Sequence, residues 1–491
     1  MKNNISKQSG VMGGLFWTFG ERIAAQLVST IVTIVLARIL DPEHYGIIAI
    51  VTVIITLLNV FVSSGFGSAL VQKKDANILD FNTAFWMSFL LSVILYAALF
   101  FVSPIIADFY KNSQLVWVIR VLGIRLIFAS LNNIQQAFIR KKMQFKKFFW
   151  ATFLGTAISG GVGITLAVLG FGVWALVFQY LTNVFIDTTI LFFVCGWKPK
   201  MQFSRESGKQ IWGFGWKVLA TELVFTIEGD IRSLIVGKVF GSADLAFYDQ
   251  GKKYPSLFVT NINSSIQKVM LPAYSKIQDE KEKLLYSLRK SVSVGIYVLA
   301  PLLIGFAVIA HNFVSVVLTD KWIACVPFVQ IFCFYFLTRP LESSCHQALL
   351  AIGKSGLVLV IMIIIHSFSL TSVLFAVFVL KSVLWIAIFS LISTFISITL
   401  FLLFTSKYLN YNFSKVISDI MPSLIIVCVM GVVVFFVGLI PMNVIVLLLV
   451  QIFIGAVVYL TLSFIFKIKP FAYLSNKAKT FLNRKDGHII R

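Results

Sequence analysis

Apolar stretches of about 20 residues recur along most of this chain, and they constrain its fold more than any other feature. A helix needs about that length of apolar sequence to cross the hydrocarbon core of a bilayer. Only 13% of the 491 residues are charged, whereas a soluble domain holds about 25%. The sequence therefore predicts an all-α integral membrane protein.

Fourteen segments are long enough to span a membrane, counting two that polar residues interrupt. Their approximate bounds are 11–39, 46–71, 81–103, 115–139, 148–168, 173–195, 210–239, 245–271, 288–311, 323–350, 356–378, 383–404, 420–440 and 443–466. The eighth and tenth are the interrupted ones, and the break between the eleventh and twelfth depends mainly on Lys381 and Ser382. We expect about 14 transmembrane helices.

The lysines and arginines between these segments give an orientation. With a cytoplasmic N-terminus, 28 of them fall at cytoplasmic ends and loops and 4 fall in outer loops. Cytoplasmic loops carry the excess of positive charge in membrane proteins. The first segment is too long for a cleavable signal and contains Glu21 and Arg22. We expect a multi-pass protein of the bacterial cytoplasmic membrane with both termini in the cytoplasm.

A weak internal repeat divides the chain. Residues 40–46 join the first two spans, and residues 240–246, 200 positions later, join the seventh and eighth. Both blocks start on the cytoplasmic side, which predicts parallel repeats with a substrate site between them near the middle of the membrane. The predicted parts are a six-helix lobe, a cytoplasmic linker, a second six-helix lobe, two extra spans and a basic tail, at 1–195, 196–210, 211–405, 406–466 and 467–491.

The segment that opens the second lobe carries unusual charge for a span. Lys217, Glu228 and Arg232 fall on one helical stripe of it. Each charge at the bilayer centre costs about 2.5–3.5 kcal/mol on insertion scales, so the stripe should face other helices or a wet cavity. The alternative is an ion pair between Glu228 and Arg232 that only joins helices.

Cations outnumber acids within the predicted spans, which suits a polyanionic ligand. The guanidinium fork binds phosphate in a bidentate way, and lysine adds a point charge. Serine, threonine, asparagine and glutamine on the same faces suit sugar hydroxyls, although such residues often serve only to pack membrane helices. The candidate substrate-binding residues are Arg22, Arg125, Asn132, Lys217, Arg232, Lys252, Lys253 and Arg339.

Carboxylates and one histidine on the predicted spans are candidates for coupling transport to an ion gradient. Glu228 is favoured because Arg232 lies one turn away, so protonation of Glu228 would release the cation. Alternatively, Glu228 merely neutralises Arg232. The further candidates are Glu222, Asp230, Glu342 and His346.

Several kinds of chemistry have no support in the sequence. We find no nucleic-acid-binding motif and no phosphate-binding glycine loop. The five histidines and five cysteines have no metal-binding or redox spacing. We therefore expect no catalytic residues, no metal, no organic cofactor and no nucleic-acid partner, with proton or sodium coupling as the energy source.

Three motifs resemble those of Wzx-type polysaccharide flippases. They are Ala37-Arg38-Ile39-Leu40-Asp41-Pro42-Glu43-His44-Tyr45-Gly46, Ser64-Gly65-Phe66-Gly67-Ser68-Ala69-Leu70-Val71-Gln72-Lys73-Lys74-Asp75 and Leu169-Gly170-Phe171-Gly172-Val173-Trp174-Ala175-Leu176. The resemblance covers most of residues 1–350, is closest to the colanic- and teichuronic-acid exporter branch, and weakens to hydropathy alone beyond it.

This resemblance implies the fold of the multidrug/oligosaccharidyl-lipid/polysaccharide exporter superfamily, with two six-helix lobes and two extra helices. It also implies alternating-access flipping of undecaprenyl-diphosphate-linked oligosaccharide to the outer leaflet. Expected partners are that lipid-linked glycan, membrane lipids and proteins of polysaccharide assembly. The alternatives are a polymerase or ligase of the same pathway, a drug or cation antiporter of the same fold, and a lipid II flippase.

Overall fold

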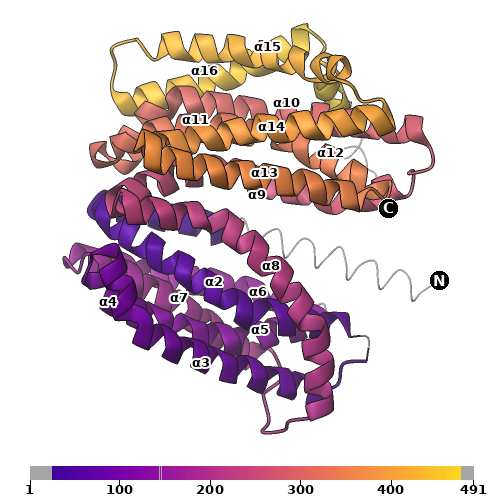
Figure 1. Ribbon diagram of the computed structural model, residues 1–491. Helices are drawn as coiled ribbons and strands as arrows, with labels where there is room; N and C mark the ends of the chain where they lie inside the picture. The colour runs from indigo at the N-terminus through magenta and orange to yellow at the C-terminus, as the bar shows by residue number, and fades with distance from the viewer. Residues whose placement is uncertain (1–24, 74, 143, 145, 477–491) are drawn as a thin grey trace, which may run out of the picture. The chain divides into compact units, whose positions relative to one another are not determined.

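The computed structural model describes residues 25–73, 75–142, 144 and 146–476, and within these ranges the regular structure is entirely helical (Figure 1). The helices gather into two compact units, residues 1–246 and 247–491, which are described separately. The predicted all-α membrane fold class is confirmed.

Unit 1 is built on the close packing of two pairs of helices. A short apolar helix at Ala25–Ile39 precedes the numbered elements. The numbered helices are α2 (Pro42–Gln72), α3 (Ile78–Tyr110), α4 (Gln114–Gly123), α5 (Arg125–Lys141), α6 (Lys146–Val168), α7 (Val173–Val194) and α8 (Arg205–Val239). The most extensive contacts join α6 to α7 and α2 to α8 (Figure 1).

Unit 2 follows a helix that crosses the boundary between the units, α9 (Ser242–Ser275). The rest of it is α10 (Lys281–Phe313), the short π-helix η1 (Val314–Leu318), the 3-10 helix η2 (Asp320–Cys325), α11 (Val326–Leu337), α12 (Arg339–Ala351), α13 (Ser355–Phe375), the π-helix η3 (Ala376–Leu380), α14 (Val383–Leu409), α15 (Phe413–Val437) and α16 (Val444–Ile465). Residues 469–476 form a further short helix. α15 and α16 pack on each other and on α10.

Eleven helical segments in the described residues are long and apolar enough to cross a membrane. The break predicted at Lys381 is present, because α13 and η3 end at Leu380 and α14 begins at Val383. Three more predicted spans coincide with α8, α9 and the helix Ala25–Ile39, which are too polar or too short to qualify on these terms. The count of fourteen thus stays a prediction.

The two repeat-related turns meet inside unit 1. A Cβ added to Gly46 would lie 1.8 Å from the carbonyl oxygen of Ser242, so only glycine allows the two backbones to approach this closely. Gly172, in the third flippase-like motif, has a φ of +56° and lies against the His44 imidazole of the first motif. These motifs therefore specify the contacts between helix ends that shape the unit.

The predicted linker, residues 196–210, is bound to α3. The Asn82 amide accepts from the backbone N–H of Lys200 at 3.2 Å and donates to Gln202 at 3.0 Å, and the Trp86 indole donates to the carbonyl of Lys200 at 2.9 Å. α8 then continues along α2, so the boundary between compact units lies after α8. This boundary does not test the predicted division into lobes at 1–195 and 211–405, which stays a prediction.

Candidate functional site

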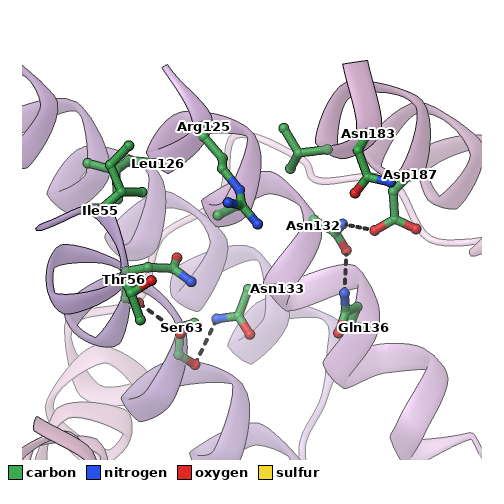
Figure 2. Close-up of a pocket in the computed structure, with 13 residues that line it drawn as sticks. Ile55, Thr56, Ser63, Arg125, Leu126, Asn132, Asn133, Gln136, Asn183 and Asp187 are labelled. Atoms are coloured by element: carbon green, nitrogen blue, oxygen red, sulfur yellow. Dashed lines mark hydrogen bonds between the residues drawn. The ribbon is translucent and has the colours of Figure 1, made fainter. Parts of the chain in front are cut away.

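A polar cavity of about 300 Å³ lies within unit 1 between α2, α5 and α7 (Figure 2). Thr56, Asn59 and Ser63 of α2 form one side, and α5 and α7 supply the others. Polar stripes at helical spacing place these side chains on one face of each helix. The cavity brings together the kinds of groups that bind phosphate and sugar.

Arg125, the first residue of α5, points its guanidinium toward this cavity (Figure 2). Its Cζ lies 5.6 Å from the centroid of the Tyr180 ring on α7, a cation–π contact. Within the part of the chain that the structure describes, Arg125 forms no ion pair. A cation without a bound carboxylate in a membrane-spanning unit is suited to an anionic ligand.

A chain of four polar side chains runs along the α5 side of the cavity to α7. Arg140 donates to Gln136 at 2.9 Å, Gln136 donates to Asn132 at 2.9 Å, and Asn132 donates to the Asp187 carboxylate at 2.5 Å. Figure 2 shows the last two of these bonds. Because each group fixes the next, Asn132 and Asp187 are held in defined orientations at the cavity.

Some polar groups at the α2 side already have hydrogen-bond partners within the protein, and others do not. The Asn133 amide donates to the carbonyls of Val62 and Ser63 at 3.2 and 3.0 Å, which ties α5 to α2. Asn59 also lines the cavity, and its buried Oδ1 has no hydrogen-bond partner in the described residues. A buried unsatisfied acceptor is costly, and a ligand hydroxyl entering the cavity could satisfy it.

Two of the predicted substrate-binding residues, Arg125 and Asn132, line this one cavity. Sequence reasoning missed its α7 side, although the signal was present: Tyr180, Asn183 and Asp187 are spaced three and four apart on the helix that lies against Arg125 and Asn132. The signal is weak because Asp187 is a single acid within a strongly apolar span.

None of the other predicted residues whose side chains are described lines this cavity. Arg22 lies outside the described residues, as do the side chains of Lys217 and Glu228. Glu222, Asp230 and Arg232 are on α8 and Lys252 and Lys253 are on α9, none of them lining the cavity. Their predicted roles in binding and coupling stay predictions.

Unit 2 holds the remaining cluster, on α12. Arg339 donates to Glu342 at 3.1 Å and also to the Tyr335 hydroxyl, and Ser397 of α14 donates to the other Glu342 oxygen at 2.8 Å. His346 packs against the Phe401 ring with 5.8 Å between centroids. Arg339 is therefore neutralised by a neighbouring acid, in contrast to Arg125. Its predicted contact with substrate stays a prediction.

Known proteins resemble this chain in sequence. The lipopolysaccharide biosynthesis protein WzxC of Escherichia coli K12 is 27% identical over 65% of this chain and 65% of its own length. The match thus spans less than two thirds of that relative. The teichuronic acid biosynthesis protein TuaB of Bacillus subtilis 168 is 24% identical over 72% of this chain and 73% of its own length.

Solved structures show the same fold. The lipid II flippase MurJ, in an inward closed conformation, superposes with a TM-score of 0.71 at 15% identity, covering 93% of this chain and 98% of MurJ. An inward-facing multidrug resistance MATE transporter gives 0.57 at 17% identity, covering 78% and 94%. The chain therefore has the all-helical transporter fold that these proteins share, as its motifs predict.

The family itself follows from a match that covers more than half of the chain and includes the whole polar cavity. The described residues around that cavity all fall between Ile55 and Asp187, inside the matched range. On these grounds the chain belongs to the polysaccharide biosynthesis protein family, whose model matches residues 35–327.

Proposed function

We propose that this protein flips an undecaprenyl-diphosphate-linked oligosaccharide from the cytoplasmic to the outer leaflet of a bacterial cytoplasmic membrane. Its termini lie in the cytoplasm, and its two lobes open alternately to either side. The transporter fold and the biosynthetic roles in the names of its relatives support this proposal. No covalent chemistry is required of the protein.

The observation that carries the proposal is the pairing of Arg125 with neutral amides and hydroxyls in one cavity. A lipid-linked glycan combines a diphosphate with many hydroxyl groups. Arg125 can bind phosphate through its bidentate fork, while Asn59 and Asn132 can exchange hydrogen bonds with sugar. At about 300 Å³ the cavity holds part of such a substrate, such as the diphosphate and the first sugar.

We propose that a proton or sodium gradient drives transport. Flipping against a concentration difference requires that an ion and the substrate favour opposite states of the protein. The carboxylates named from the sequence are candidates, and Asp187 joins them because it lies in the same cavity as Arg125. Asn132 holds Asp187 in place, so an ion bound there would change the charge next to the substrate.

The test is to deplete the protein in its native host and locate the lipid-linked oligosaccharide. We expect the intermediate to accumulate in spheroplasts in a form that a membrane-impermeant glycan label cannot reach. Restoring the wild-type chain should return the label to the intermediate. The comparison requires equal total intermediate, measured after lipid extraction.

The same experiment separates the alternatives. If the unpolymerised intermediate accumulates and the label reaches it fully, the lost step is polymerisation or ligation on the outer face, and the flippase proposal is wrong. If depletion changes neither amount nor exposure of the intermediate while sensitivity to cationic drugs rises, the protein is a drug antiporter.

A further inference from the structure

A second cavity, of about 500 Å³, lies in unit 2 where α10 and α15 begin and the chain emerges from α16. Its polar lining consists chiefly of Tyr286, Arg289, Lys290, Asp419, Lys469 and Tyr473. α10 and α15 are candidate membrane spans, and the third wall comes directly after the candidate span α16, so we expect the cavity to lie near a membrane surface. It is separate from the cavity around Arg125.

One side of this cavity is a fixed ion pair. Arg289 binds Asp419 through two nitrogens, with Nε–Oδ2 at 2.9 Å and Nη2–Oδ1 at 2.7 Å. The Tyr411 hydroxyl, in the loop before α15, donates to the same carboxylate at 3.3 Å. Burial and the adjacent Asp419 carboxylate raise the pKa of Tyr411, so it remains a donor. Arg289 is therefore neutralised and positions α10 against α15.

Two lysines remain for a ligand. The Lys290 Nζ lies 3.6 Å from the centroid of the Tyr473 ring and 5.7 Å from that of Tyr286, so it is held between two aromatic faces. Lys469 is exposed and also lines the cavity, one turn before Tyr473 on the segment after α16. Neither lysine has a carboxylate within 4 Å among the described residues. Glu282 is the only other acid in the lining, so the open groups carry net positive charge.

The surroundings match those of a lipid headgroup. Tyrosine is enriched at membrane interfaces, and Tyr286 is 66% exposed there. This end of unit 2 carries the lysines and arginines that mark the cytoplasmic side, and the cytoplasmic leaflet is anionic. Basic pockets between helix ends on this side bind anionic headgroups in membrane proteins.

We propose that this cavity binds the phosphate headgroup of an anionic phospholipid, with Lys290 and Lys469 on the phosphate and Tyr286 and Tyr473 at the glycerol. The bound lipid would join α10, α15 and the segment after α16. Residues 477–491, which follow this segment in the chain, are poorly suited to fill a basic cavity because they contain five lysines and arginines and one acid. This site is independent of the transport activity proposed above and rests only on the cytoplasmic placement of the termini.

The test uses delipidated full-length protein in a neutral detergent, titrated with phosphatidylglycerol or with phosphatidylcholine while the melting temperature is followed. We expect phosphatidylglycerol to raise the melting temperature at lower concentration than phosphatidylcholine. At about fivefold per lysine near a membrane surface, Lys290→Gln with Lys469→Gln should weaken phosphatidylglycerol binding roughly 30-fold. Lys290→Arg, which keeps the charge, should bind within about threefold of wild type.

The matched control is Lys281→Gln with Lys283→Gln. These lysines lie at the same end of α10 and outside the cavity lining, and their loss changes net charge equally. Equal weakening by both pairs would mean general surface attraction and would overturn the proposal. So would wild-type binding by the Lys290/Lys469 pair. If glycerol phosphate or inorganic phosphate alone raises the melting temperature as much as the lipid does, the site takes a soluble phosphate instead.

Discussion

Two arginines that look alike in sequence have opposite surroundings in the structure. Arg125 begins α5 and faces a cavity lined by amides, hydroxyls and the Asp187 carboxylate, with an aromatic ring beside it and no ion pair in the described residues. Arg339 begins α12 and is bound by Glu342 three residues later and by the Tyr335 hydroxyl. The first has a charge available to a ligand, and the second has a charge already compensated.

This difference indicates different uses of cations in the two units. An uncompensated charge in a membrane protein is costly to insert, and such charges usually mark a transported ligand or ion. A charge with its own acid, one turn away, can be inserted as a neutral pair and can join helices. Here Ser397 extends the pair to α14. We therefore expect Arg125 to act mainly in transport and Arg339 mainly in stability.

Replacing Arg125 should have the largest effect on export. A charge-assisted bidentate contact contributes about 1.5–3 kcal/mol, so Arg125→Ala should lower export about 10- to 100-fold. Arg125→Lys should recover part of it, since the charge remains and the fork is lost. The measurement is the rate at which labelled glycan reaches the cell surface, divided by the amount of inserted protein.

Arg120→Ala is the control for this substitution. Arg120 is also embedded, but its guanidinium is bound by Ser103 at 3.0 Å and lies over the Phe100 ring, 4.2 Å from its centroid. Its loss should reduce stability more than export per folded molecule. Wild-type export by Arg125→Ala would remove the basis for assigning the cavity to substrate.

Breaking the ion pair in unit 2 should instead reduce stability. Glu342→Gln leaves Arg339 without its counter-charge, and for a partly buried pair the loss in free energy of unfolding should be about 2 kcal/mol. Adding Arg339→Gln should restore much of it, because no charge then remains uncompensated. Unfolding midpoints in detergent for the two single variants and the double variant give the interaction energy between Arg339 and Glu342. Strict additivity would show that the pair is not coupled.

A smaller effect should follow from interrupting the polar chain at the first cavity. Asn132→Ala removes the donor to Asp187 and the acceptor of Gln136, so we expect export to fall about tenfold. Asn133→Ala is the comparison, because its amide is committed to α2 carbonyls. It should lower the melting temperature with less effect on export per folded molecule. The reverse ranking would mean that Asn132 only packs α5 against α7.

Much of the fold could be predicted from the sequence, since apolar length and basic loops are properties of single segments. The break at Lys381 was predicted for this reason. The packing of α8 along α2 could not be, because it depends on close approaches such as that of Gly65 to Gly215, where a Cβ on Gly65 would lie 2.9 Å from the Gly215 carbonyl oxygen. Nothing in either segment alone predicts that partner.

The candidate site was predicted in part for a similar reason. Periodicity placed Arg125 and Asn132 on one face of a helix, and the structure opens that face onto a cavity. Periodicity places Glu342 one turn from Arg339, but it could not show that Ser397 of α14 holds that carboxylate or that Arg125 has no ion pair in the described residues. The contribution of Asp187 depends on α5 lying against α7, which is a tertiary property.

Direct binding of undecaprenyl diphosphate to the purified full-length protein tests the central claim, that Arg125 is a cation available to the substrate. The account predicts that Arg125→Ala weakens binding about 10- to 100-fold. The Arg339→Gln/Glu342→Gln double variant, which lacks the unit 2 ion pair but leaves no uncompensated charge, should bind within about threefold of wild type. Unchanged binding by Arg125→Ala together with loss of binding by the double variant would contradict the account and place the diphosphate at Arg339.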